Sequence, residues 1–366
     1  MTFLRLPFET VFSDESGGNV KTPQREYLQT GAFPIVDQGK ILVSGYTNDA
    51  SRVCGEGRPA IVFGDHTRCI KYVDFEFCMG ADGIKVLRPK MEADLKYLYY
   101  YLHSLRLPDA GYDRHYKYLK RTEIPLPPLP EQRRIAAILD QADALRAKRR
   151  EALAQLDSLT QSIFIEMFGD PARNTKELPL VSLDIIGKWK SGGTPPRSQG
   201  AYFSGSIPWF SSGELDSMYV SESFEKITPE AIHETSAKLV SYGALMLGMY
   251  DTAALKASIA DVECSCNQAI AFALLDKNMV ETVYVYQAIT IGREHFRRLQ
   301  RGVRQKNLNL EMIKQIQIPI PPIEMQRIFS ERVVALRKIK KFHECSLAQI
   351  DSLFASLQSR AFRGEL

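Results

Sequence analysis

The sequence predicts a mixed α/β protein with two domains, each built on an irregular mixed sheet and each followed by a long helix. A proline-rich segment and the stretch after it occur twice at one constant spacing: Ile124–Leu129 returns as Ile318–Ile323, and Leu153–Leu159 returns as Leu347–Leu353. Before each copy lies a longer stretch of short apolar or β-branched runs separated by Gly, Asp and Asn. This is a tandem duplication, because solenoid repeats measure roughly 20–50 residues, and it favours a pseudo-twofold arrangement.

The duplication divides the chain into four segments. We expect a first domain at residues 1–123, a hinge and helix at 124–173, a second domain at 174–317, and a second hinge and helix at 318–366. A chain of 366 residues is long enough for two domains with separate cores.

Within the two domains, short apolar runs predict strands and longer ones predict helices. We expect strands at Ile41–Val43, Ala60–Phe63 and Ala269–Leu275, and helices at about Leu95–Leu105 and Val283–Leu299.

The first long helix is predicted from its end signals. It should begin near Pro130 or Glu131, because proline is tolerated at the first helical position and an acidic residue there suits the helix dipole. It should end at Phe168, since Gly169 suits a left-handed cap and Pro171 prevents continuation.

Both long helices carry a heptad-like apolar stripe. Each could pack on its own domain, but the matching lengths and patterns favour an antiparallel coiled coil between the two. Arg149 and His343 fall at mid-helix and should form a polar layer, with His343 neutral or compensated by Glu344 or Glu151. The expected seam consists of Ile135, Ala142, Leu145, Arg149, Leu156, Leu159 and Ile163 in the first helix, and Phe329, Leu336, Ile339, His343, Ile350, Leu353 and Leu357 in the second.

The composition is that of an ordinary globular protein. The net charge of +4 is too small to indicate nucleic-acid binding by itself, so the distribution of charge matters more. The six cysteines form no CxxC pair and have no histidine at zinc spacing, so no metal site is expected. Cys264 and Cys266 should share the buried face of a strand. Reduced thiols, the lack of a signal peptide and the lack of a membrane-spanning run predict a cytoplasmic protein.

No catalytic motif was found in the sequence. There is no phosphate-binding loop and no G-x-G-x-x-G after a strand. The Pro-Pro pairs lack the Asp or Asn and the aromatic residue that flank them in adenine methyltransferases. A triad of distant residues stays open, but nothing nominates one. We therefore expect recognition and not catalysis, so a chain that is not an enzyme.

Basic and aromatic residues instead cluster at equivalent places, in Gly111–Arg121 and in Arg293–Asn307, just before the two proline-rich segments. Lys and Arg neutralise phosphates, while Arg, Gln and Asn can read base edges. The alternative is a solvated face, but two clusters at equivalent places of a duplication favour DNA binding.

Further polar turns are candidates for the same role, although such turns often only satisfy backbone groups. They include Gly64–Arg68 with Gly80–Gly83, and the corresponding segments Met249–Thr252 and Cys266–Gln268. The predicted DNA-contacting residues are Lys21, Arg25, His66, Thr67, Arg68, Arg114, His115, Tyr116, Lys117, Thr194, Arg197, Arg301, Arg304, Gln305, Lys306 and Asn307.

These motifs together resemble those of the specificity subunits of type I restriction-modification systems. Ile124–Gln132 is similar to the start of that family's conserved helical regions, and Ser191–Pro195 with Ile207–Trp209 resembles the opening of its target recognition domains. The resemblance covers essentially the whole chain. The chain departs from it at Glu324–Gln326, which lacks the proline of the first copy, and in the aromatic tract from Gly111.

The resemblance implies a fold and a role. Each target recognition domain would read one half of a bipartite DNA target through the major groove, and the antiparallel helices would set the distance between the halves. Two methyltransferase subunits would bind one such subunit, and two restriction subunits would join them in the full complex. S-adenosylmethionine, ATP and magnesium would belong to these partners and not to this chain.

Two alternatives stay open. One is the recognition part of a type IIG-like enzyme or of another phage-defence assembly. The end at Phe362–Leu366, which matches the end of the first helix, favours a stand-alone subunit instead. The other is a coiled-coil scaffold without DNA binding, which the lack of salt-dependent, sequence-selective DNA binding would reveal.

Overall fold

The computed structural model describes residues 3–54, 58–81, 83–108, 111, 113–298 and 307–366. The chain divides into two compact units, which are described separately below. Unit 1 comprises residues 1–151 and 344–366, and unit 2 comprises residues 152–343. Among the described residues, no helix is both long enough and apolar enough to cross a membrane.

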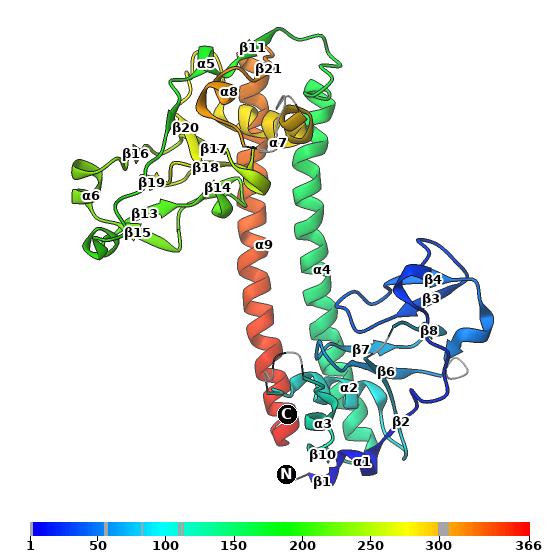
Figure 1. Ribbon diagram of the computed structural model, residues 1–366. Helices are drawn as coiled ribbons and strands as arrows, with labels where there is room; N and C mark the ends of the chain where they lie inside the picture. Colours follow the sequence, from blue (N-terminus) through cyan, green and yellow to red (C-terminus); the bar gives the residue numbers. More distant parts are fainter. Residues whose placement is uncertain (1–2, 55–57, 82, 109–110, 112, 299–306) are drawn as a thin grey trace. The chain divides into compact units, whose positions relative to one another are not determined.

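Unit 1 contains a mixed α/β domain and segments of both long helices (Figure 1). In chain order its elements are β1 (Leu4–Pro7), α1 (Phe8–Val11), β2 (Phe12–Asp14), η1 (Gln24–Glu26), β3 (Phe33–Val36), β4 (Gly45–Thr47), η2 (Ala50–Arg52), β5 (Val53–Cys54), β6 (Ala60–Gly64), β7 (Ile70–Val73), β8 (Phe77–Met79), β9 (Ile84–Pro89), α2 (Leu95–Ser104), α3 (Tyr116–Leu119), β10 (Glu123–Leu126), and parts of α4 (Leu129–Phe168) and α9 (Ile323–Arg363). Its strands form sheets of order β2-β9-β6-β7 and β4-β3-β8-β5 and the two-stranded ladder β1-β10.

Unit 2 repeats this plan. Its further elements are β11 (Leu180–Ser182), α5 (Leu183–Ile186), β12 (Lys190–Ser191), η4 (Gly200–Phe203), β13 (Ile207–Phe210), η5 (Ser212–Glu214), β14 (Tyr219–Val220), β15 (Glu225–Ile227), α6 (Pro229–Glu234), β16 (Leu239–Val240), β17 (Leu245–Gly248), η6 (Asp251–Ala253), β18 (Ala257–Ala260), β19 (Cys264–Cys266), β20 (Ile270–Ala273), α7 (Thr282–Arg298), α8 (Leu310–Lys314) and β21 (Gln317–Pro319). The sheets have the orders β12-β20-β17-β18-β14 and β15-β13-β19-β16, with the ladder β11-β21. Apart from β14, each strand has its counterpart in unit 1 in the same position and order.

The predicted fold class is therefore confirmed: mixed α/β domains with irregular sheets, followed by two long helices. The predicted helices near residues 95, 130 and 283 match α2, α4 and α7, and Gly169 takes the left-handed conformation just after α4 ends. The predicted strand Ile41–Val43 is wrong. These residues form an exposed loop, and the strand of this region is β4, which begins at Gly45.

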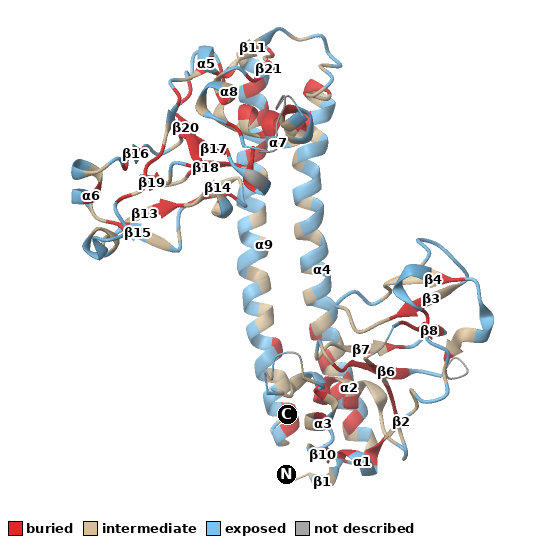
Figure 2. Cartoon of the chain, in the orientation of Figure 1, coloured by how far each residue is buried: buried red, intermediate tan, exposed pale blue. Residues whose placement is uncertain are grey.

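The core of each unit lies between its sheets and its long-helix segments (Figure 2). In unit 1, Tyr97 of α2 packs edge-on against Phe362, near the end of α9. In unit 2, Tyr284 of α7 packs against Phe168, the last residue of α4. Each domain is thus held both by the start of the helix that follows it and by the end of the other helix.

The proline-rich segments marked as hinges in the sequence form strands. Ile124 pairs with Leu6 in the β1-β10 ladder, and Ile318 pairs with Val181 in the β11-β21 ladder. Proline fits because a strand in a two-stranded ladder needs to donate along one edge only. The Tyr97 hydroxyl donates to the Pro125 carbonyl at 2.7 Å, and the Tyr284 hydroxyl donates to the Pro319 carbonyl at 2.6 Å.

The repeated glutamine after each proline-rich segment has a structural role. The Gln132 amide donates to the Pro127 carbonyl at 2.8 Å and accepts from the Asp94 N–H at 2.9 Å. The Gln326 amide donates to the Pro321 carbonyl at 2.8 Å and accepts from the Glu281 N–H at 3.0 Å. Each glutamine thus joins the start of a long helix to the start of α2 or α7.

We predict that Gln326→Met lowers the free energy of unfolding of unit 2 by about 1–3 kcal/mol, because the Glu281 N–H loses its acceptor in a buried site. Both tryptophans, Trp189 and Trp209, lie in unit 2, so tryptophan fluorescence follows the unfolding of that unit. The matched control is Gln161→Met at an exposed position of α4, which should leave the midpoint unchanged. Equal midpoints for the two variants would refute the assigned role.

The long helices run antiparallel within each unit. In unit 1, the Arg146 guanidinium pairs with the Asp351 carboxylate, and Arg134, earlier in α4, donates to the carbonyl of the later Leu366. In unit 2, Lys340 pairs with Asp157, and Phe329, earlier in α9, packs against Phe164, later in α4.

Some residues of the predicted seam between the two long helices are buried, and others are exposed. Ile135, Ala142 and Phe329 are buried. By contrast, Leu145, Leu159, Ile339 and Leu353 are 42–56% exposed. The other predicted seam residues, Arg149, Leu156, Ile163, Leu336, His343, Ile350 and Leu357, are half-buried.

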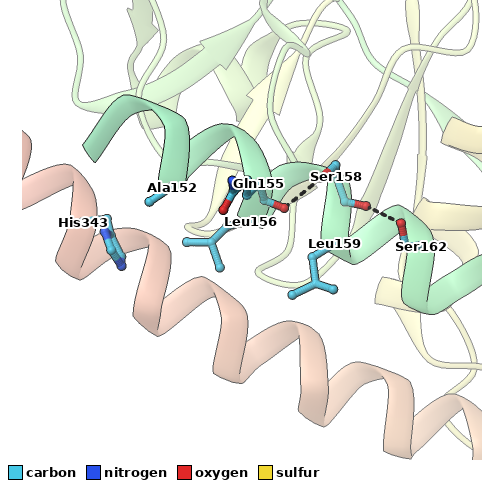
Figure 3. Close-up of a pocket in the computed structure, with 7 residues that line it drawn as sticks. All are labelled: Ala152, Gln155, Leu156, Ser158, Leu159, Ser162 and His343. Atoms are coloured by element: carbon cyan, nitrogen blue, oxygen red, sulfur yellow. Dashed lines mark hydrogen bonds between the residues drawn. The ribbon is translucent and has the colours of Figure 1, made fainter. Parts of the chain in front are cut away.

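In unit 2, a pocket of about 370 Å³ lies between α4 and α9. Ala152, Leu156 and Leu159 project from α4 towards α9, where His343 lies on the other side (Figure 3). Arg149 belongs to unit 1 and His343 to unit 2, so the polar layer expected from this pair stays a prediction.

Candidate nucleic-acid interface

The turn between β6 and β7 organises the polar loops of unit 1. It closes through hydrogen bonds from the Gly64 N–H to the Cys69 carbonyl and from the Arg68 N–H to the Gly64 carbonyl, both 2.8 Å long. A Cβ at residue 64 would lie 2.3 Å from the Thr67 hydroxyl and 3.0 Å from the Gln38 carbonyl oxygen, so a larger residue would displace the Thr67 side chain. Arg68 has a left-handed φ of 60°, an uncommon conformation for a residue other than glycine.

The loop after β3 is bound to this turn. The Thr67 hydroxyl donates to the Gln38 carbonyl at 2.5 Å, and the His66 N–H donates to the Gln38 side chain at 3.4 Å. Thr67 is exposed and His66 and Arg68 are half-buried, so these three predicted contact residues lie together near the surface.

Asp65 joins the same turn to the basic segment before α3. Its buried carboxylate accepts the Tyr116 N–H at 2.7 Å, and its carbonyl accepts the His115 N–H at 2.8 Å. The His115 ring nitrogen Nδ1 also lies 3.0 Å from this carbonyl. The contact predicted for His115 is therefore wrong, because a side chain only 1% exposed cannot reach DNA.

The other residues of this segment have different surroundings. Arg114 and Lys117 are exposed, and Lys117 pairs with Asp113 at 2.5 Å. Tyr116 is half-buried, with the ammonium groups of Lys85 and Lys120 lying 4.9 and 5.7 Å from its ring centre. Burial raises the pKa of the Tyr116 hydroxyl. The Tyr116 ring thus packs against two of the lysines of this basic surface and contributes little to the surface itself.

Lys21 lies on the loop after β2 and Arg25 in the short helix η1 that follows, and this segment is bonded to the end of β8. The Thr22 N–H donates to the Met79 carbonyl at 2.9 Å, at the end of β8. Gly80 is packed closely between Tyr27 and Asp37. An added Cβ there would lie only 2.3 Å from the tyrosine oxygen. The predicted residues of unit 1 thus lie on linked loops at the carboxyl ends of β3, β6 and β8.

Unit 2 repeats these connections. The Gly193 N–H donates to the Cys266 carbonyl at 2.9 Å, as Thr22 does to Met79, and the neighbouring Thr194 hydroxyl bonds to the Gln268 side chain. The Leu308 N–H donates to the Met249 carbonyl at 2.7 Å, as His115 does to Asp65.

The predicted residues of this second basic segment are only partly described. Asn307 is exposed, beside Leu308. Arg301, Arg304, Gln305 and Lys306 lie outside the described residues.

Arg197 has a fixed position in unit 2. Its guanidinium forms a two-pronged ion pair with Glu225, with one contact of 2.8 Å, and lies over the rings of Phe203 and Trp209. The hydrogen bond from Arg197 lowers the pKa of the Glu225 carboxyl. A phosphate would therefore have to compete with Glu225 for this guanidinium.

Two lysines that the sequence analysis missed hold the loops in place. The Lys71 ammonium donates to the Asp37 carbonyl at 2.8 Å and to the Ile41 carbonyl. The Lys256 ammonium donates to the Gly213 carbonyl at 3.3 Å and pairs with Asp216. Each lysine ties the loop after β3 or β13 to the hairpin β6-β7 or β17-β18. Nothing local in the sequence distinguishes them from exposed lysines.

Two irregular α/β domains of the same topology, each with polar loops gathered at its strand ends and each followed by a long helix, define a protein built from two copies of one module. The family model of the type I restriction modification DNA specificity domain matches residues 15–155 and 178–351. The chain belongs to this family, and DNA recognition is the role that follows from membership.

Individual relatives agree with this assignment. The chain is 28% identical over 345 residues to the specificity subunit of the type I restriction enzyme EcoR124I/EcoR124II of Escherichia coli, over 88% of this chain and 84% of the relative. The fold is similar to a crystal structure of the S subunit of a type I restriction-modification system from M. genitalium, with a TM-score of 0.64, 15% identity and coverage of 98% and 96%. A structure from work on complex assembly of the type I restriction-modification system has a TM-score of 0.54 at 17% identity, over 97% and 98% of the two chains.

Proposed function

We propose that this chain is a non-catalytic specificity subunit that reads a bipartite DNA target, with one half-site for each unit. The observation that carries the proposal is the repetition of one loop arrangement in both units. In each, the loops at the ends of equivalent strands are joined by equivalent hydrogen bonds. Exposed cations lie on the connected segments, such as Arg114 before α3 and Arg197 after β12. Cations position such loops on phosphates, and polar side chains beside them can reach base edges.

The helices would hold the partner subunits. Leu145 and Ile339 occupy equivalent positions of α4 and α9, and both are more than 40% exposed. Apolar side chains exposed at equivalent positions of a duplication suit two copies of one partner. We propose that two methyltransferase subunits bind here, that two restriction subunits join them, and that S-adenosylmethionine, ATP and magnesium bind to those partners. The purified chain alone should then transfer no methyl group to DNA.

We predict that replacing Arg68, Arg114 and Lys117 together by Ala weakens DNA binding by the methyltransferase complex. If all three contact phosphates, the slope of log affinity against log salt concentration should fall by about one unit for each residue. A member that reads a base should instead relax one target position, at about 1–3 kcal/mol. Fluorescence anisotropy at several salt concentrations measures both effects.

The matched control is the triple Ala variant of Arg5, Arg58 and Lys90. These cations belong to the same unit but lie away from the loops, Arg58 and Lys90 being at the opposite ends of β6 and β9. The control should keep the wild-type slope. If both triple variants lose the same slope, net charge is responsible and the proposed interface is wrong.

A further inference from the structure

Strand β14, for which the described part of unit 1 shows no counterpart, forms an edge of its sheet beside α9 (Figure 1). It pairs in parallel with β18, and directly after this pairing the Asp261 N–H donates to the Val220 carbonyl at 2.9 Å. Tyr219 pairs with Ile259, so Tyr219 and Asp261 lie on the same face of the sheet, since residues two apart in a strand point to one side. The strand β14 thus places an aromatic ring beside a carboxylate.

Arg337 of α9 contacts both of these side chains. Its guanidinium donates to the two oxygens of the Asp261 carboxylate, at 2.5 and 3.4 Å, and lies 3.8 Å from the centre of the Tyr219 ring. Tyr219 and Asp261 are half-buried, which reduces the screening of these contacts by water. A planar guanidinium that is paired with a carboxylate and stacked on a ring has a defined direction, which a lone ion pair lacks. We call these three residues the Arg337 clamp.

The clamp is one of two polar contact points between the second domain and α9. The other is the Gln326 amide at the start of the helix, which accepts the Glu281 N–H. Arg337 lies about 16 Å further along α9, at 1.5 Å per residue. Between the two points, Phe329 and Val333 are buried in the core of unit 2. Two contact points separated along one axis fix the angle between a domain and a helix, whereas a single point allows the domain to tilt.

Unit 1 joins its domain to its helix with the opposite arrangement of charge. At the position of α4 that corresponds to Arg337 stands an acid, Asp143, and Asp140 one turn earlier pairs with Lys96 of α2. The Lys96 ammonium also lies 5.5 Å from the ring centre of Tyr72 in β7. In unit 1 the helix thus supplies the acid and the domain the cation, and in unit 2 the reverse holds. The Arg337 clamp is therefore a feature of unit 2 and not of the duplicated fold.

We propose that the Arg337 clamp is a positioning device that fixes the angle of the second domain on α9, and thereby the gap between half-sites that the protein accepts. The inference rests on the proposed function, the reading of a bipartite target. One added base pair moves a half-site by about 3.4 Å along the duplex and by about 35° around it. A domain held at two points of α9 cannot follow this shift without breaking the clamp, whereas a domain held at one point can tilt towards it.

The test is a charge exchange. Methyltransferase complexes that contain the wild-type chain, R337D, D261R or R337D/D261R are titrated by fluorescence anisotropy with three duplexes. One carries the target found by mapping methylated adenines, and the others have one base pair more or less in its gap. In each single variant like charges face each other, so the selectivity for the native gap should fall roughly tenfold. The double variant restores the ion pair and should recover most of this selectivity. The matched control K338D, with the same charge change at the next, exposed residue, should keep the wild-type selectivity.

A second measurement on the same complexes needs no DNA. Spin labels at K226C in β15 and K341C in α9 report the distance between the second domain and the helix by pulsed electron paramagnetic resonance. The background C69S/C345S removes the two cysteines that are not buried. The wild type should give a narrow distance distribution, R337D should at least double its width, and the charge exchange should narrow it again.

The outcomes separate the possible errors. If R337D keeps the wild-type selectivity for the gap, or if the double variant is no better than the single ones, the clamp does not set the gap and the inference is wrong. It is equally wrong if the distance distribution broadens while the selectivity stays unchanged, because the clamp then has a structural role only. If the wild-type complex shows no sequence-selective binding, the proposed function fails, and this inference fails with it even where the label distances change as expected. Where R337D lowers the thermal midpoint, R337K, which keeps the charge but loses the fork and the stacking, should still lose part of the selectivity.

Discussion

Replacing residues 174–319 by the equivalent segment of a relative will change one half of the methylated target and leave the other half as it was. The segment runs from before β11 to the end of β21, so that the β11-β21 ladder and the bond from Tyr284 to Pro319 are exchanged together. A junction at residue 317 would divide β21. Because each mismatched base pair costs about 1–3 kcal/mol, a fully changed half-site should lower affinity for the original target by a thousandfold or more.

Sequencing of methylated adenines in cells that express the hybrid subunit with its methyltransferase measures this result. The reciprocal control exchanges residues 3–126, from β1 to the end of β10, and should change the other half only. A hybrid that alters both halves, or neither, would contradict independent reading by the two units.

Phe329→Ala will lower the free energy of unfolding of unit 2 by about 3–5 kcal/mol. The ring is fully buried, with ring centres of Phe164 and Phe168 at 5.5 and 5.6 Å, so its removal leaves a cavity where α9 begins and α4 ends. Fluorescence of the two tryptophans, both in unit 2, follows the transition.

Ile328→Ala is the matched control, because this neighbouring side chain on the same helix is 47% exposed. It should change the free energy of unfolding by no more than about 0.5 kcal/mol. If the two variants unfold at the same denaturant concentration, the aromatic cluster does not hold the two helices together in unit 2.

Features set by local chemistry could be predicted closely. The ends of α4 follow from prolines before it and Gly169 after it, because capping depends on neighbours in the chain. Cys264 and Cys266 are buried in one cluster, as the alternation of a strand requires, and burial raises the pKa of the Cys264 thiol to about 12. By contrast, Ile41–Val43 has the apolar residues of a strand but no neighbouring strand to pair with.

Some residues of the candidate site could be proposed from the sequence, and others could not. His66, Thr67 and Arg68 could be proposed because polar residues in a glycine-containing turn are visible in one sequence, and the structure places them together near the surface. His115 stood in a basic, aromatic run and looked exposed, yet Asp65 draws it into the interior. Lys71 and Lys256 could not be distinguished, since their acceptors lie on loops far away in the chain.

The sequence by itself determined that the chain is a duplication and which family it resembles. It also determined where the long helices begin and end, because repeats, prolines and capping residues can be recognised from residues adjacent in the chain. Only the tertiary structure decided which surfaces those helices cover. Phe362 packs on Tyr97 and Phe168 on Tyr284, so the end of α9 completes the core of unit 1 and the end of α4 completes the core of unit 2. Such pairings depend on side chains far apart in the chain that meet only when both helices and both sheets are formed, and no local pattern encodes them.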